Sequence, residues 1–206
     1  MHGAAREGIA LARAIADTEI NSVTDNPVII NGSSVSGGNF HGAAIALALD
    51  TLAIALTQLA AISERRTFRL LDPKLSGLPP FLTQDAGVNS GMMITQLLAA
   101  SLLTDCRMLS APASVQSVPT SGSQEDFVSM GMNSALKARR IVDHLATILA
   151  IELLCSAQAI QISGRLVPPR LRLAFRKVRS AVPFLARDRE LYQDIAQLKA
   201  ILTSLL

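Results

Sequence analysis

Two long apolar runs, each interrupted by one acidic residue, constrain the fold of this chain more than any other feature. Residues 43–62 and 145–160 are apolar enough to be mistaken for membrane spans. Asp50 lies within the first run and Glu152 within the second. Each acid opposes insertion by about 2–3 kcal/mol, and neither run has Trp or Tyr at its ends. Outside a membrane, a helix that is apolar nearly all round lies inside a bundle or an oligomer. We therefore expect buried helices and no membrane span.

The composition also favours close-packed helices. Half of the 206 residues are apolar, but only 3% are aromatic and there is no Trp. Chains rich in Ala and Leu form helices more readily than sheets, so we expect an all-α fold. The net charge of +3 comes from a basic C-terminal third and does not imply nucleic-acid binding.

The two cysteines, Cys106 and Cys155, lie in separate apolar stretches without the spacing of a metal site. This pattern is typical of reduced core residues in a cytoplasmic protein, and we expect no metal site. No N-terminal stretch resembles a signal peptide.

The order of apolar patterns and chain breaks predicts the elements. A helical pattern runs from the first residues to Ile20 without a preceding cap, so either the helix begins at the terminus or an upstream part is missing. Asn31-Gly32 between short β-favouring runs predicts a small hairpin. Gly164 predicts a helix end. The expected helices span residues 43–69, 88–109 and 124–162, followed by a basic helix after Pro168-Pro169 and a last helix from Asp188.

We expect residues 1–164 to form the central portion of a long-helix bundle. We expect residues 165–206 to form a helical tail packed on the same domain. Arginines and lysines cluster in this tail, where a solvated face is a better interpretation than a nucleic-acid site. Glu64 and Arg65 can pair with neighbouring helices, but solvation is the more common outcome for such residues.

A glycine-rich segment, residues 36–42, is the first candidate site. Its paired glycines allow close approach to the backbone, and Asn39, Phe40 and His41 then offer an amide, an apolar plate and an imidazole before a long helix. The segment lacks the spacing of a dinucleotide-binding loop. The alternative is a flexible helix entry in which His41 is an ordinary hydrogen-bonding residue.

An acidic segment, residues 119–130, is the second candidate. Ser123 has the character of an N-cap, with Asp126 three positions later, which places Glu125 in a first helical turn next to Gln124. Free N–H groups and the helix dipole would favour an ionised Glu125 there. The alternative is an ordinary capped helix start.

Several motifs occur in the order and spacing of one enzyme family. They are Thr24-Asp25-Asn26-Pro27, Ser36-Gly37-Gly38-Asn39-Phe40-His41, Ser63-Glu64-Arg65-Arg66, Leu78-Pro79-Pro80-Phe81-Leu82, Gly87-Val88-Asn89-Ser90-Gly91, Pro119-Thr120-Ser121 and Gln124-Glu125-Asp126 with Val128-Ser129-Met130. With them the chain resembles the C-terminal portion, about the last two-fifths, of an aromatic amino acid ammonia-lyase of the histidine type.

The resemblance implies a long-helix bundle of the ammonia-lyase (fumarase/aspartase-like) type, with a hairpin excursion near the N-terminus, assembled as a homotetramer with composite active sites. It implies elimination of ammonia from an aromatic amino acid by means of a methylidene-imidazolone prosthetic group made from Ala-Ser-Gly. This sequence contains no Ala-Ser-Gly, and its single tyrosine, Tyr192, lies in the tail. The tyrosine-bearing segments of the family's active site are therefore absent as well.

The resemblance also assigns residues. Phe40 matches the phenylalanine that packs near the prosthetic group, and Glu125 matches the acid that faces the substrate amino group in histidine-type members. Asn39, His41 and Gln124 belong to the same neighbourhood, as contacts or as scaffolding. Phe127 stands where histidine-type members commonly have histidine, which leaves the substrate side chain open between histidine and phenylalanine or tyrosine.

Three hypotheses follow from the sequence. In the first, the chain is part of a cytoplasmic enzyme that converts L-histidine to trans-urocanate, inactive by itself and completed by a homo-oligomer or an N-terminal partner polypeptide. In that case it is a fragment, a truncated gene product or half of a split enzyme. In the second, it comes from a phenylalanine or tyrosine ammonia-lyase relative. In the third, it is a non-catalytic helical assembly remnant.

Overall fold

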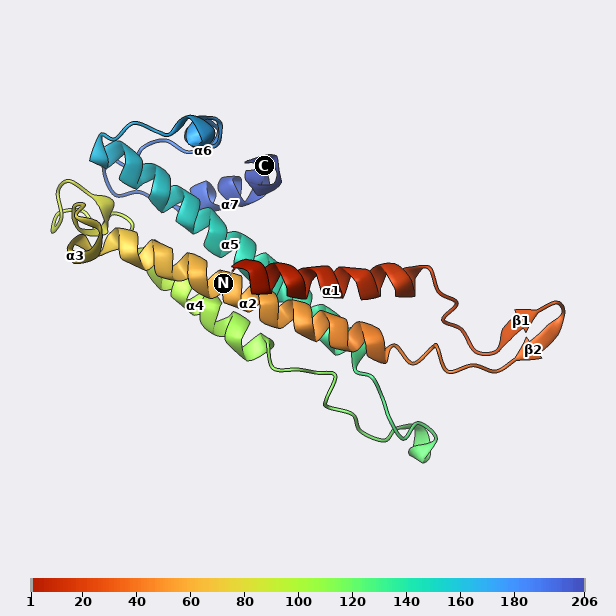
Figure 1. Cartoon of the computed structure of the whole chain (residues 1–206). Coiled ribbons are helices and arrows are strands. Elements are labelled where there is room, and N and C mark those ends of the chain that lie inside the picture. Colours follow the sequence, from red (N-terminus) through yellow and green to blue (C-terminus); the bar gives the residue numbers. More distant parts are fainter. Residues whose placement is uncertain (1, 206) are drawn as a thin grey trace. The chain divides into compact units, whose positions relative to one another are not determined.

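The computed structural model describes residues 2–205, which cluster into two compact units. The first unit comprises residues up to 59 together with 106–142, and the second comprises 60–105 together with 143–206. Figure 1 follows the chain through its elements. Helices α2 (Ala43–Leu71), α4 (Met93–Leu109) and α5 (Gly131–Ser163) each contribute residues to both units.

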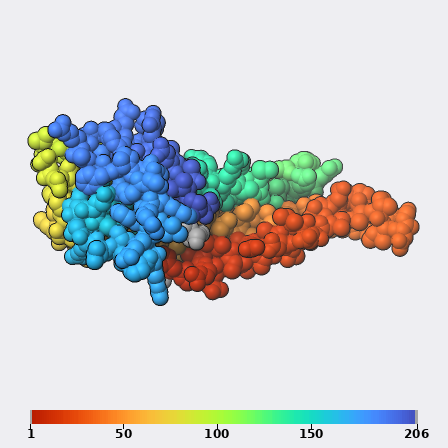
Figure 2. Space-filling model, turned by 90° about the horizontal axis from the view of Figure 1, so that it is seen from above, coloured from red at the N-terminus to blue at the C-terminus, as the bar shows by residue number. Residues whose placement is uncertain are grey.

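The N-terminal elements of the first unit are those expected from the sequence. Helix α1 covers His2–Ile20, and strands β1 (Val28–Ile30) and β2 (Ser33–Val35) pair antiparallel. Asn31 and Gly32 both have positive φ, 51° and 80°, as the tight turn of such a hairpin requires. The hairpin projects from the rest of its unit, and its surface is open to solvent (Figure 2). The prediction of an all-α fold with one hairpin excursion is confirmed.

Small residues allow α1 and α2 to pack closely in the first unit. A Cβ atom on Gly8 would lie 2.9 Å from the Cβ of Ala55. Ala5 and Ala12 of α1 are buried, as are Ala46 and Ala53 of α2. Small side chains at a helix contact let the two backbones approach, so this core is built from alanines where a sheet protein would use aromatics.

The second unit is held together around the C-terminal half of α5. Ile151 and Leu154 there are buried, and the amide of Gln158 bonds to backbone groups of Leu82 and Leu185. Its remaining elements are the short helix α3 (Pro73–Ser76), α6 (Arg172–Ala181), α7 (Tyr192–Ile201) and the 3-10 turns Pro80–Leu82, Pro169–Leu171 and Leu202–Leu205. Gln158 thus ties two irregular segments to one helix through buried hydrogen bonds.

Two predicted helix starts in the second unit were wrong for one shared reason. The predicted helix from residue 88 begins instead at Met93, and α7 begins at Tyr192 rather than at Asp188. The Asp188 carboxylate accepts hydrogen bonds from the N–H groups of Ser90 (2.7 Å) and Gly91 (2.9 Å). Asp188 therefore satisfies free donors ahead of α4 and does not cap its own helix.

The end of α5 agrees with the sequence, whereas its start does not. Gly164 follows α5 with φ 64°, the left-handed conformation of a helix stop. The helix begins at Gly131, seven residues after the predicted start at Gln124. The proposed division between residues 164 and 165 falls just after this helix, and as a domain boundary it stays a prediction.

Glu64 and Glu152 each bind neighbouring polar side chains. The expectation that Glu64 and Arg65 would be solvated was wrong for the Glu64 carboxylate. Glu64 is only 1% exposed and is held by both Arg65 and Gln96. Glu152 accepts from Ser63 and Arg66. Burial demands partners for an ionised group, and these side chains supply them.

Helices α2 and α5 are long and apolar enough to cross a membrane, a test that buried core helices also pass.

Candidate functional site

The glycine-rich segment forms an ordered approach to α2. The Asn26 side-chain oxygen accepts from Gly37 N–H at 3.1 Å, and the Asn39 amide donates to the Val23 carbonyl at 2.9 Å. The backbone N–H of His41 donates to the Gly38 carbonyl. The bond to Val23 gives the Asn39 side chain a structural role in this segment, while the Phe40 side chain remains 55% exposed. Phe40 is therefore the residue of this segment with a free apolar surface.

The acidic segment is a loop, and Glu125 does not lie in a first helical turn as predicted. Its backbone pairs with Thr120, whose N–H donates to the Glu125 carbonyl at 2.9 Å. The turn between them, Ser121–Ser123, has positive φ at all three residues. A left-handed Ser123, with φ 70°, cannot act as an N-cap, which needs extended backbone.

A hydroxyl group, in place of a helix dipole, holds the Glu125 carboxylate. Thr120 Oγ1 donates to Glu125 Oε2 at 2.6 Å. The side chains of Gln124 and Glu125 are exposed. The carboxylate is thus oriented by one short hydrogen bond and remains accessible to a ligand.

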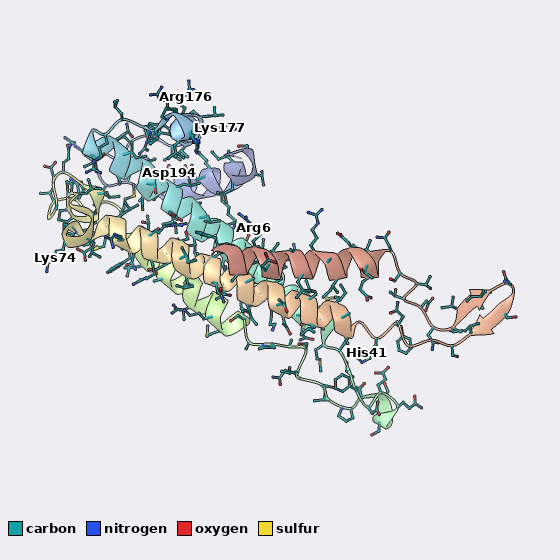
Figure 3. All side chains as sticks on the ribbon, in the orientation of Figure 1. Arg6, His41, Lys74, Arg176, Lys177 and Asp194 are labelled. Atoms are coloured by element: carbon teal, nitrogen blue, oxygen red, sulfur yellow. The ribbon has the colours of Figure 1, made fainter. Side chains whose placement is uncertain are left out.

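His41 and Phe127 bring the two segments together. His41 Nε2 lies 2.8 Å from the Phe127 carbonyl oxygen, and their rings stack with centroids 5.7 Å apart. The bond requires a proton on Nε2, which fixes the tautomer of a neutral His41. His41 lies just before α2, beside the loop that leads into α5 (Figure 3). Gly42 and Gly131 extend the contact, since a Cβ atom on Gly131 would lie 3.7 Å from the Gly42 carbonyl.

The predicted site residues take different positions around the His41–Phe127 contact. His41 joins the segments, Asn39 braces one of them, and Phe40, Gln124 and Glu125 present exposed side chains. Sequence reasoning missed Thr120 as the partner of Glu125 and the Phe127 carbonyl as the partner of His41. A hydroxyl five residues before a glutamate is a weak signal, and a carbonyl leaves no trace in the sequence.

The exposed Glu125 carboxylate can accept hydrogen bonds from a cation. An exposed carboxylate accepts hydrogen bonds from an ammonium group, and Phe40 and Phe127, 55% and 60% exposed, offer apolar faces in the same unit. Among residues 2–205, no group of three or more His, Cys, Asp or Glu side chains is arranged to hold a metal ion.

Comparison with a family model identifies the chain's relatives. The model described as aromatic amino acid lyase matches residues 1–180. The histidine ammonia-lyase of Stigmatella aurantiaca is 51% identical to this chain over a matched length of 210 residues, gaps included. The match covers 99% of this chain and 41% of that protein. The chain thus spans about two-fifths of the length of the curated relatives that it matches.

Solved structures agree with this result. The histidine ammonia-lyase of Trypanosoma cruzi superposes with a TM-score of 0.93 at 42% identity, covering 97% of this chain and 41% of that one. The tyrosine aminomutase of Streptomyces globisporus gives the same TM-score of 0.93 at 41% identity, covering 98% and 39% of the two chains.

Proposed function

Since this chain belongs to the aromatic amino acid lyase family, we propose that it forms part of a histidine-type ammonia-lyase. The reaction is elimination of ammonia from L-histidine to give trans-urocanate. Identity of about one half to histidine ammonia-lyases supports this substrate. The observation that carries the proposal is the His41–Phe127 contact, since it joins the segment bearing Phe40 to the segment bearing Glu125.

In this proposal Glu125 binds the amino group of the substrate. Its carboxylate, oriented by Thr120, holds the ammonium of the amino acid or accepts a proton from it. Phe40 provides an apolar wall, and His41 fixes the distance between the two segments. Asn39 and Gln124 support this neighbourhood.

The prosthetic group of the family does not fit this chain alone. The 206 residues contain no Ala-Ser-Gly, so they cannot form a methylidene-imidazolone from their own backbone. In the complete site that group supplies the electrophile for the amine. We therefore assign its formation to residues outside this chain, in an N-terminal polypeptide or portion. The proposal includes a homotetramer, a cytoplasmic location and a role in histidine catabolism.

A phenylalanine or tyrosine substrate is the second candidate. Phe127 follows Asp126 where histidine-type members commonly carry histidine, and the chain is 41% identical to a tyrosine aminomutase over their common length. An apolar ring at this position favours an aromatic hydrocarbon side chain over an imidazole.

The test is an assay of the purified chain, first alone and then mixed with a companion polypeptide. The companion is the part of the Stigmatella aurantiaca enzyme that this chain does not match. Ammonia release and absorbance of the unsaturated product are measured with histidine, phenylalanine and tyrosine. We expect activity only in the mixture, with histidine preferred.

Glu125→Gln is the decisive variant, and Asp126→Asn is its matched control in the same exposed loop. We expect Glu125→Gln to lower kcat/KM about 100-fold, because an amide neither carries the charge nor accepts a proton. Asp126→Asn should change kcat/KM less than about threefold. A preference for phenylalanine or tyrosine would establish the second candidate. An inactive mixture would leave a helical remnant.

A further inference from the structure

Asp50 is a buried carboxylate in an otherwise apolar stretch of α2. It is 2% exposed, and each of its oxygens has a separate partner. Lys137 Nζ of α5 lies 3.1 Å from Oδ1, and the Ser114 N–H donates to Oδ2 at 2.7 Å. A buried charge must be compensated in this way, because an unpaired carboxylate in an apolar core is strongly unfavourable.

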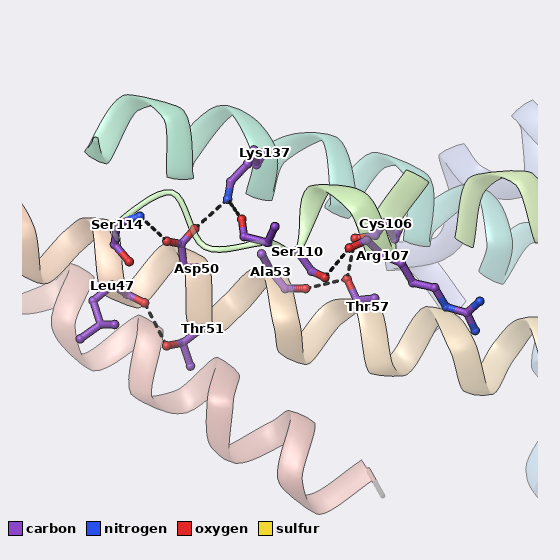
Figure 4. A network of polar contacts seen from close by, with 11 residues as sticks. Leu47, Asp50, Thr51, Ala53, Thr57, Cys106, Arg107, Ser110, Ser114 and Lys137 are labelled. Carbon is purple, nitrogen blue, oxygen red and sulfur yellow. Dashed lines mark hydrogen bonds and ion pairs between the residues drawn. The ribbon is translucent and has the colours of Figure 1, made fainter. Parts of the chain in front are cut away.

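Lys137 has a second contact, with the same loop that Ser114 belongs to. Its ammonium donates to the Ala111 carbonyl as well as pairing with Asp50 (Figure 4). The Lys137 side chain is 19% exposed, so both contacts are largely screened from water. The ion pair therefore holds the loop at residues 111 and 114, immediately after α4.

A short chain of contacts leads from these anchors to the candidate site. Ser117 lies three residues after Ser114, and its hydroxyl oxygen accepts from the Val128 N–H at 2.8 Å. That bond closes the loop 117–128, which contains the Thr120–Glu125 pair. The position of Glu125 relative to α2 thus depends on the Asp50 and Lys137 anchors at one end and on His41 at the other.

We propose that Asp50 and Lys137 are positioning residues that fix the loop carrying Glu125, an inference that rests on the proposed function. Compensation of the buried Asp50 charge by Lys137 does not require a contact with the loop. Yet both side chains also bind the loop backbone. Asp50 accepts a hydrogen bond from the Ser114 N–H, and Lys137 donates one to the Ala111 carbonyl. Charged partners form stronger hydrogen bonds than neutral ones, which makes them suitable anchors for residues 110–130, a segment that contains no α-helix.

Hydrogen exchange of the purified chain tests the anchoring directly. Lys137→Met keeps an unbranched stem of similar length and removes the charge, whereas Lys137→Arg keeps the charge. Arg139→Met removes the same charge from an exposed position two residues away on α5. We expect Lys137→Met to accelerate amide exchange in residues 110–130 about tenfold or more, with little change in α1. Lys137→Arg should restore most of the protection, and Arg139→Met should have no effect.

A double variant separates anchoring from general destabilisation. Asp50→Asn with Lys137→Met removes both charges, so no unpaired ion is left in the core. Acceleration confined to residues 110–130 in this variant supports the proposal. Unchanged loop exchange, or equal acceleration throughout the first unit, overturns it.

The mixture with the companion polypeptide tests whether anchoring acts through Glu125. We expect Lys137→Met to lower kcat/KM about 10-fold to 100-fold in the wild type but less than about twofold when Glu125 is already Gln. Equal losses in both backgrounds would overturn an action through Glu125. If the wild-type mixture is inactive, the proposed function fails, and the exchange experiment still decides whether the ion pair holds the loop.

Discussion

Gly91 occupies a position that tolerates no side chain. Its φ is 57°, and a Cβ atom there would lie 2.6 Å from the Phe81 carbonyl oxygen and 3.0 Å from Thr83 Cβ. Because a carbonyl cannot move as a flexible side chain does, we expect Gly91→Ala to lower the free energy of unfolding by about 3 kcal/mol. Urea titration followed by circular dichroism measures the change.

Two other glycines separate the causes of this effect. Gly87 also has positive φ, 102°, but has open space around its Cα, so Gly87→Ala should cost about 1 kcal/mol from backbone strain alone. Gly38 has neither constraint, and Gly38→Ala should be nearly neutral. Similar losses for Gly91→Ala and Gly87→Ala would show that the Phe81 contact adds nothing.

Glu125 stays a predicted site residue, and its surroundings differ from those that the sequence predicted. Ser123 followed by Asp126 is a capping pattern, and the same residues are also common in turns. Contacts distant in sequence decided between the two, since the Phe127 carbonyl meets His41 and the Val128 N–H meets Ser117. A local pattern cannot report a partner 86 residues away.

At the scale of elements, the Asp50 anchor makes the loop sensitive to acid. Burial alone would raise the pKa of Asp50, but hydrogen bonds from Ser114 and the charge of Lys137 outweigh it, so the pKa lies below its ordinary value of 3.8. Because the pKa of Asp50 is lower in the folded chain than in the unfolded chain, the ionised carboxylate stabilises the fold at pH values above the unfolded-state pKa. This contribution is lost as the pH falls through the folded-state pKa.

We therefore expect constant protection of residues 110–130 from neutral pH down to about pH 4, followed by a loss at lower pH. Hydrogen exchange at a series of pH values, corrected for the intrinsic rates, measures it. In Asp50→Asn this particular loss should disappear, because residue 50 no longer titrates. A loop that opens over the same pH range in both proteins would contradict the assignment to Asp50.

Elements that depend on local chemistry were predicted well. The hairpin follows from Asn31-Gly32, and the ends of α1 and α5 follow from local breaks in the helical pattern. Starts of helices were missed where a distant side chain satisfies the free N–H groups, as Asp188 does for Ser90 and Gly91. The burial of Glu64 was missed because Gln96, its partner, lies on another helix.

At the scale of the whole molecule, many large apolar side chains among residues 2–205 are exposed to solvent. Leu97 and Ile94 of α4 are 56% and 60% exposed, and Leu47 of α2 is 59% exposed. The chain also spans only 41% of the length of a close relative. Apolar surface of this extent favours association, because its removal from water is favourable at roughly 25 cal/mol per Å².

We expect the purified chain to self-associate at micromolar concentration, as judged by sedimentation velocity over a range of concentrations. Leu97→Glu should shift the distribution towards monomer, since like charges would then face each other across any contact between copies of this helix face. Ser101→Glu introduces the same charge at an exposed, already polar position of α4 and should shift it less. A concentration-independent monomer would contradict the expectation, because it would mean that the apolar faces of α2 and α4 stay in water without a partner.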